Sequence, residues 1–194
     1  MKLCLIGHSF KYELEKLIRI FLPFEKIEFA EEAADGDGTA VTRLDKTADK
    51  TVLSALLLIN GKSYNKSYEL SNDAVDYNNE CERLLAVALY DCFVSASSYV
   101  PEWGILTGVR PAKLFSRLAA ENGEANAENW FKNALKVGDE KISLCRSTVV
   151  SEGKITSLSR PDSFSLYISI PFCPTRCSYC SFVSQSVEKS MKLI

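Results

Sequence analysis

The chain has 194 residues, and its 23 Lys and Arg against 25 Asp and Glu leave a formal net charge of −2. Hydrophobic residues make up 46% and charged residues 25%, which is typical of a folded globular chain and excludes a wholly disordered one. The near-neutral charge gives no support to binding of nucleic acid or of a membrane surface. No apolar run approaches the ~20 residues of a membrane-spanning helix, and the apolar start is too short for a signal peptide. We therefore expect a cytoplasmic protein whose seven cysteines are core thiols or metal ligands and not disulfides.

The first 70 residues have the pattern of a small α/β fold. Apolar residues at helical spacing predict a helix over 11–22, which Pro23 ends. Asn60-Gly61 is a strong signal for a two-residue hairpin turn, because both positions accept a positive φ. Five short strands are predicted, the last three as an antiparallel meander: 2–6, 26–30, 39–44, 51–59 and 63–70.

Helices dominate the next 80 residues. Ser71 or Asn72 is the expected N-cap of a long helix, and Pro111 and Gly123 mark the start and end of a later one. Four cysteines fall in apolar surroundings, where a small buried hydrophobe is favoured over a ligand: Cys4, Cys81, Cys92 and Cys145. The helices are predicted at 71–97, 111–122, 127–137 and 139–151, and a polar linker at 153–163.

Three basic residues recur at helical spacing, two of them within the helix predicted at 111–122 and Arg110 directly before it. Arg110, Lys113 and Arg117 stand at positions i, i+3 and i+7, after a Gly-rich, aromatic and irregular stretch at 99–111. Such a face can bind an anionic group. A solvated helix surface is the commoner explanation of such a pattern, and on the sequence alone we favour it.

The chemistry lies in the last quarter of the chain. Residues 164–170 alternate between apolar and polar side chains, which predicts a strand with one buried face. The loop that follows carries Cys173, Cys177 and Cys180 at the spacing C-x3-C-x2-C. Three closely spaced thiolates suit a soft metal centre.

Three kinds of site are consistent with this loop. Structural zinc usually has four Cys or His ligands, and His8, the single histidine, lies at the other end of the chain. A redox disulfide between Cys177 and Cys180 leaves the third cysteine unexplained. An iron–sulfur cluster held by three cysteines leaves one iron open for a cofactor or substrate. We rank the iron–sulfur site first, zinc second and redox thiols third.

The loop resembles the signature of radical S-adenosylmethionine enzymes, because an aromatic residue, Tyr179, precedes its last cysteine. The flanking residues are similar to those of the oxygen-independent coproporphyrinogen III oxidase group. Leu166, Tyr167 and Ile170-Pro171-Phe172-Cys173 match its strand and loop. The segment Trp103-Gly104-Ile105-Leu106-Thr107-Gly108-Val109-Arg110-Pro111-Ala112-Lys113-Leu114 resembles an upstream segment of the coproporphyrinogen dehydrogenase branch.

The resemblance implies a [4Fe–4S] cluster ligated by Cys173, Cys177 and Cys180, with S-adenosylmethionine on the open iron. Tyr167 would lie beside the S-adenosylmethionine, and Tyr179 would pack near the cluster or the adenine. The implied function is that of an oxidoreductase of haem biosynthesis, which decarboxylates coproporphyrinogen III oxidatively to protoporphyrinogen IX. Its partners would be a porphyrinogen substrate and a cellular electron donor. No catalytic residue beyond the cluster loop is implied.

Two positions depart from the pattern of the typical oxidases. Ser169 stands where they have a histidine, and Phe182 stands where they have a further cysteine. Both departures occur in relatives that carry haem, so a haem-trafficking relative is an alternative, and a non-catalytic zinc module is another.

The resemblance and the elements together predict two domains. Residues 1–155 are expected to form an α/β domain of helices on a small mixed sheet. Residues 156–194 are expected to begin a radical-enzyme (β/α) barrel, with 164–170 as its first strand. A full (β/α)8 barrel takes ~250 residues. We therefore expect a fragment of a longer enzyme that is inactive by itself.

Overall fold

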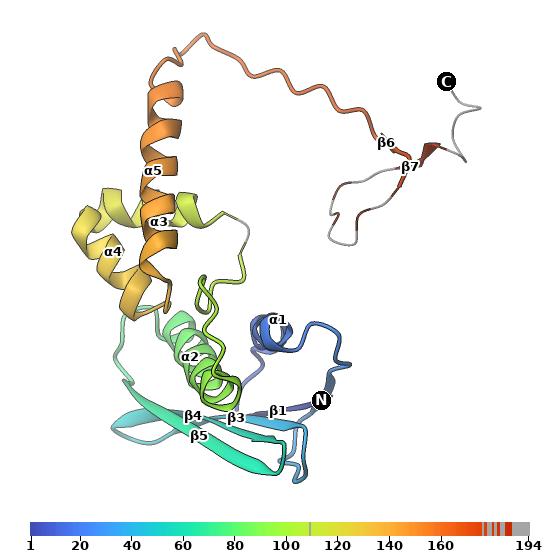
Figure 1. Ribbon diagram of the computed structural model, residues 1–194. Coiled ribbons are helices and arrows are strands. Elements are labelled where there is room, and N and C mark those ends of the chain that lie inside the picture. Colours follow the sequence, from blue (N-terminus) through green and yellow to red (C-terminus); the bar gives the residue numbers. More distant parts are fainter. Residues whose placement is uncertain (109, 176, 178–179, 181, 183–184, 188–194) are drawn as a thin grey trace. The chain divides into compact units, whose positions relative to one another are not determined.

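The computed structural model describes residues 1–108, 110–175, 177, 180, 182 and 185–187. The chain divides into two units, Met1–Lys154 and Ile155–Ile194. The first unit holds most of the regular structure, and the second is largely an extended segment with a short β-ladder (Figure 1).

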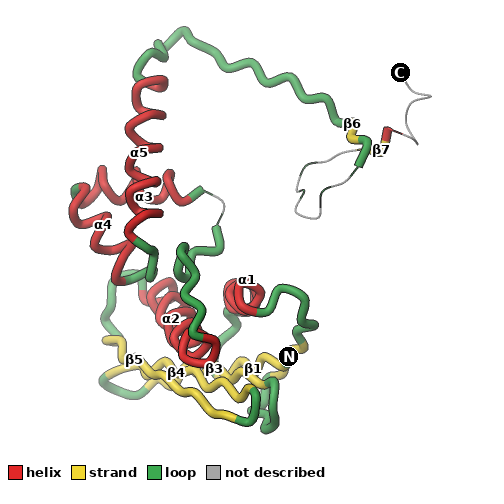
Figure 2. Tube along the Cα trace, in the orientation of Figure 1, coloured by secondary structure: helices red, strands yellow, loops and turns green. Residues whose placement is uncertain are grey.

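The first unit contains a five-stranded mixed sheet, as predicted (Figure 2). The spatial order is β2-β1-β3-β4-β5, in which β1 runs parallel to both β2 and β3, and β3, β4 and β5 are antiparallel. Asn60 and Gly61 have φ values of 53° and 68° and join the last two strands in the predicted hairpin. The strands are β1 (Lys2–Ile6), β2 (Glu28–Ala30), β3 (Thr39–Lys46), β4 (Lys50–Ile59) and β5 (Lys62–Ser71).

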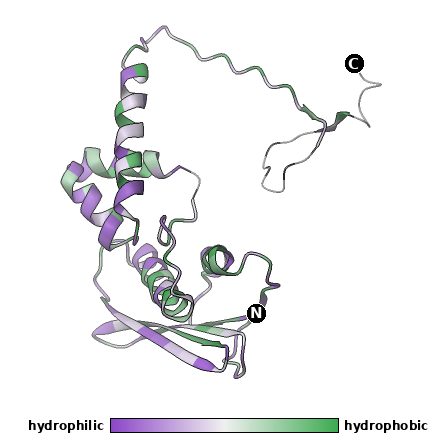
Figure 3. Cartoon of the chain, viewed as in Figure 1, coloured by the Kyte–Doolittle hydropathy of each residue, from purple (hydrophilic) through white to green (hydrophobic). Residues whose placement is uncertain are grey.

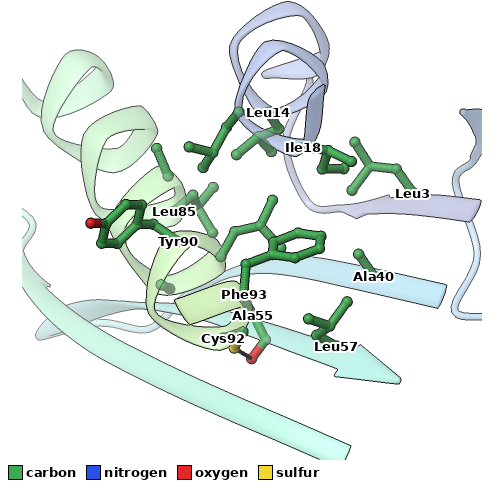
Figure 4. Packing of buried hydrophobic residues seen from close by; sticks show 14 of the residues in the cluster. Leu3, Leu14, Ile18, Ala40, Ala55, Leu57, Leu85, Tyr90, Cys92 and Phe93 are labelled. Atoms are coloured by element: carbon green, nitrogen blue, oxygen red, sulfur yellow. Dashed lines mark hydrogen bonds between the residues drawn. The ribbon is translucent and has the colours of Figure 1, made fainter. Parts of the chain in front are cut away.

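Two helices cover one face of this sheet, α1 (Lys11–Phe21) and α2 (Tyr77–Ser97). In the close view, Leu14 and Ile18 of α1 and Phe93 of α2 point into the space above the strands (Figure 4). The sheet side of this core comes from alternate positions of β4, namely Leu53, Ala55 and Leu57, which are nearly fully buried. Every second side chain of β4 and the apolar faces of α1 and α2 therefore pack together in one apolar layer. The outer strand β5 carries hydrophilic stretches (Figure 3).

The expected start of the long helix was wrong by several residues. Ser71 ends β5, and α2 begins only at Tyr77. The Asn72 side-chain amide donates hydrogen bonds to the carbonyls of Thr47 (2.9 Å) and Ala48 (3.1 Å), and so secures the turn between β3 and β4. A residue that caps a strand turn in this way does not cap the helix.

A second cluster of helices follows, made of α3 (Pro111–Asn122), α4 (Glu124–Asn133) and α5 (Asp139–Thr156). The rings of Phe115 and Phe131 meet edge to face at 5.3 Å, and both are fully buried. The bounds of α3 match the prediction. Helix α4 begins earlier than the predicted residue 127, directly after Gly123, and ends four residues before 137. Helix α5 continues to Thr156, into the segment predicted as a linker.

The second unit differs most from the prediction. Residues 164–170 form no strand, and Phe164, Leu166, Ile168 and Ile170 are all at least three-quarters exposed. A strand needs a neighbour for its backbone groups, and no other strand of the described residues lies beside this segment. The ladder that does form pairs β6 (Phe172–Cys173) with β7 (Gln185–Ser186) in parallel. None of the helices in the described ranges combines the length and hydrophobicity that a membrane crossing requires.

Candidate functional site

The three-cysteine loop begins at β6, which contains Cys173. The thiols of Cys173 and Cys180 are partly buried, and that of Cys177 is exposed. The backbone N–H of Cys180 donates to the carbonyl oxygen of Cys177 at 3.1 Å, and that of Gln185 donates to Pro171 at 2.8 Å. The first bond makes a turn between two cysteines, and the second brings the end of the loop back to its start.

The described residues of the loop are not gathered into a formed metal site. Among the residues with described positions, no group of three or more His, Cys, Asp or Glu side chains is placed to hold a metal ion. The chemistry of the donor set nevertheless fits an iron–sulfur cluster, since three thiols with one exposed member lie on a short loop. Tyr167 is 79% exposed in the extended segment before β6. Tyr179 lies outside the described residues.

The other four cysteines are buried in the first unit, as predicted: Cys4, Cys81, Cys92 and Cys145. The Cys92 thiol lies 3.5 Å from the carbonyl oxygens of Ala55 and Tyr64, and burial raises its pKa to about 12. Burial also raises the pKa of the Cys81 and Cys145 thiols. Because the thiolate is the metal ligand, thiols with raised pKa values are poor candidates for the cluster.

A second candidate site lies within the first unit, and sequence reasoning did not favour it. A cavity of about 830 Å³ is lined by residues of α3, by residues of α5 and by Trp103. Arg110, Lys113 and Arg117, interpreted above as a solvated face, all line this one cavity. The tryptophan near this basic pattern was the signal available in the sequence, but the pocket exists only because residues of α5 lie opposite those of α3 and form its other wall.

Trp103 is held in place by contacts from the start of α5. The Lys141 ammonium forms an ion pair with Glu102 at 2.7 Å and lies 5.9 Å from the centroid of the Trp103 ring. The Gly138 N–H donates to the Glu102 carbonyl at 2.8 Å. These contacts fix the loop at 101–106 before α3 begins, so that the indole forms part of the cavity wall.

Comparison with known proteins gives one informative relative. The chain is 39% identical over 90 residues to the oxygen-independent coproporphyrinogen-III oxidase-like protein HemZ of Bacillus subtilis. The match covers 45% of this chain and 18% of the length of HemZ. No family model and no solved structure matches the chain. The resemblance inferred from the residues is thus confirmed: over nearly half of its length, the chain is similar to an oxygen-independent coproporphyrinogen-III oxidase-like protein.

Proposed function

We propose that the chain is part of a radical S-adenosylmethionine oxidoreductase related to the oxygen-independent coproporphyrinogen III oxidases. The observation that carries the proposal is the 39% identity to HemZ over 90 residues, whose own name states an oxidase-like relationship. The loop with Cys173, Cys177 and Cys180 supports it, because it supplies the donor set that such chemistry requires. The protein would act in the cytoplasm.

The three loop cysteines would hold a [4Fe–4S] cluster, and S-adenosylmethionine would complete the site. When bound, these groups supply an organic radical that removes hydrogen from the substrate. The exposed Cys177 would be the accessible ligand, and the partly buried Cys173 and Cys180 would anchor the cluster to the β6–β7 ladder and the Cys177–Cys180 turn. Tyr167 and Tyr179 are the candidates to contact S-adenosylmethionine.

The proposed reaction is the oxidative decarboxylation of coproporphyrinogen III to protoporphyrinogen IX, with a cellular electron donor. A second candidate is haem trafficking by a protein that keeps the cluster. It is favoured by Ser169 and Phe182, which replace a histidine and a cysteine of the typical oxidases.

The first test is the iron and sulfide content of the chain after anaerobic reconstitution. We expect about four irons and four sulfides per chain, lost in Cys177→Ala and retained in the control Cys81→Ala, which removes a buried thiol outside the loop. Zinc that stays bound in air, or identical metal content in both variants, would contradict the cluster and favour the zinc module or no metal site.

A second test separates the two functions that use a cluster. S-adenosylmethionine added to the reduced cluster should change its electron paramagnetic resonance spectrum if it binds the open iron. Conversion of coproporphyrinogen III by the reconstituted full-length parent enzyme supports the oxidase. Tight haem binding with no consumption of coproporphyrinogen III supports trafficking.

A further inference from the structure

Helix α3 separates two grooves of opposite charge within the first unit. The basic groove is the cavity of about 830 Å³ between α3 and α5, which Arg110, Lys113 and Arg117 line. The acidic groove, of about 680 Å³, lies on the other side of α3 and is lined by carboxylates of α1, α2 and α3. Arg117 borders both grooves, so they adjoin along the helix.

The acidic groove holds carboxylates that the fold leaves without ion pairs. Its described lining has five acidic side chains and two cations. One of the cations, Arg83, already pairs with Glu80 at 2.6 Å. In contrast, Glu13, Glu82 and Glu121 form no ion pair with any residue whose position is described. Burial and, next, the neighbouring Glu13 carboxylate raise the pKa of Glu82. A cation that enters this groove would therefore be stabilised.

The basic groove has the opposite imbalance. Arg110, Lys113 and Arg117 are all exposed, and none of them forms an ion pair within the described part of the chain. A cation of α5 shows the contrast, because Arg146 pairs with Glu128 at 3.3 Å. Three cations without ion pairs on one side of α3 thus match three such carboxylates on the other side.

Each groove also contains a partly buried tryptophan. Trp103 lines the basic groove and Trp130 lines the acidic groove, and these are the two tryptophans of the chain. Leu144 adds apolar surface to the basic groove and is 50% exposed. Tryptophan and arginine are enriched at protein–protein interfaces, where buried rings supply most of the binding energy. Exposed ion pairs alone contribute little, so this apolar surface is needed for a stable contact.

The acidic groove is already formed before any partner binds. The Arg83 guanidinium donates to the Ala134 carbonyl oxygen at 3.1 Å, which ties α2 to the residue after α4. The Ile105 N–H donates to the Leu135 carbonyl oxygen at 2.9 Å, which ties the segment before α3 to the same place. A groove held in this way loses little conformational freedom on binding.

We propose that two copies of the chain dimerise through α3, so that the basic groove of each copy lies against the acidic groove of the other. A two-fold axis along α3 exchanges the two sides of the helix, and the contact is therefore reciprocal. The occupant is a second copy because one chain carries both complementary surfaces side by side. The formal net charge of −2 agrees with local pairing of charges, since it provides no strong overall field to attract a highly charged partner.

The first measurement is the mass of the 194-residue chain in solution by sedimentation equilibrium. Reducing conditions keep the exposed Cys177 from linking two copies by a disulfide. We expect a reversible dimer of twice the 21.6 kDa chain mass. Its dissociation constant should rise with salt concentration, because salt screens exposed charges. A chain that stays monomeric at low salt and high protein concentration overturns the proposal, and the grooves would then serve other partners.

Charge reversal locates the contact. Lys113→Glu/Arg117→Glu makes both grooves acidic, and Glu82→Lys/Glu121→Lys makes both basic. Each variant alone should have a dissociation constant raised about tenfold or more, because attractive contacts become repulsive. An equimolar mixture of the two should form a heterodimer, since an acidic pair of grooves then meets a basic pair. Recovery of the dimer in the mixture also shows that both variants are folded.

A matched control places the same charge change elsewhere. Lys62→Glu/Lys66→Glu reverses two exposed lysines of the edge strand β5 and should dimerise like the unmodified chain. A dimer that persists in both groove variants, a mixture that does not associate, or a dimer lost only in the β5 control overturns the proposal. The dimer is formed by the first unit and needs no metal cluster, so its outcome does not depend on the proposed function.

Discussion

Gly104 is a residue whose side-chain position is already filled by backbone. Its φ is +56°, and a Cβ there would lie 2.1 Å from the Leu135 carbonyl oxygen and 2.5 Å from the Lys136 carbonyl. Gly61 has a similar φ of +68° with nothing within 4 Å of a Cβ. Gly61→Ala should therefore lower the free energy of unfolding by about 1–2 kcal/mol, because alanine is disfavoured in the left-handed backbone conformation. Gly104→Ala should lower the free energy of unfolding by about 3 kcal/mol or more, because the backbone at Leu135 and Lys136 must also move to make room for the Cβ. Urea unfolding of the two variants measures the difference. Equal losses of stability would contradict the close approach of the Leu135 and Lys136 carbonyls to Gly104.

His8 is expected to make stability depend on pH. Its Nε2 lies 3.3 Å from the Thr42 carbonyl oxygen, and its Nδ1 accepts a hydrogen bond from the Phe10 N–H at 3.3 Å. Burial lowers the pKa of His8 below its ordinary value of 6.5, and the Thr42 hydrogen bond opposes this shift in part. Protonation also removes the acceptor at Nδ1.

The sign of the pH effect follows from that lowered pKa. Below pH 6.5 the unfolded chain binds a proton more readily than the folded one, so stability falls as the pH is lowered from 7.5 to 5.5 and is fully present above 6.5. His8→Asn should flatten this part of the stability profile. Because His8 is the single histidine, its proton resonance also reports the titration directly. A midpoint above 6.5 in the folded chain would refute the prediction.

At the scale of elements, the packing of α3 on α4 rests on a small aromatic centre. Phe131 is fully buried, and its ring meets that of Phe115. Phe131→Ala should lower the free energy of unfolding by about 3–5 kcal/mol, because it removes apolar burial and leaves a cavity. Phe24, which is 99% exposed, provides the control, and Phe24→Ala should change stability by less than about 0.5 kcal/mol. Thermal unfolding checks both, and a small loss for Phe131→Ala would mean that the helices repack.

The elements predicted correctly were those whose ends are marked by residues within the element itself, such as proline, glycine or an Asn-Gly pair. Helix α3 has Pro111 at its start and Gly123 after its end, and its bounds match the prediction. The Asn60-Gly61 turn requires positive φ, and the hairpin follows. The prediction for the start of α2 was wrong because the Asn72 side chain donates a hydrogen bond to the Thr47 carbonyl in the turn between β3 and β4 and so does not cap the helix. Residues 164–170 have a strand pattern, but a pattern does not provide the neighbouring strand that pairs with it.

For the molecule as a whole, the division into two units predicts where a protease acts first. Residues 155–171 are exposed and contain no helix or strand beyond Thr156. Chymotrypsin should cut after Phe164 or Tyr167, which are 88% and 79% exposed, well before it cuts within residues 1–154. Mass spectrometry of a short digestion identifies the first cut. An early cut within residues 1–154, or a chain that chymotrypsin does not cut, would contradict the division into two units.

The sequence by itself determined the composition of the sheet, the positions of most helices, the buried state of four cysteines and the resemblance to the coproporphyrinogen oxidases. These depend on local periodicity, on turn residues and on the spacing of Cys173, Cys177 and Cys180. Only the tertiary structure decided that β1 joins β3 in parallel and that Arg110, Lys113 and Arg117 line one cavity. Both results depend on contacts between residues far apart in the chain, and no local pattern encodes which surfaces will meet.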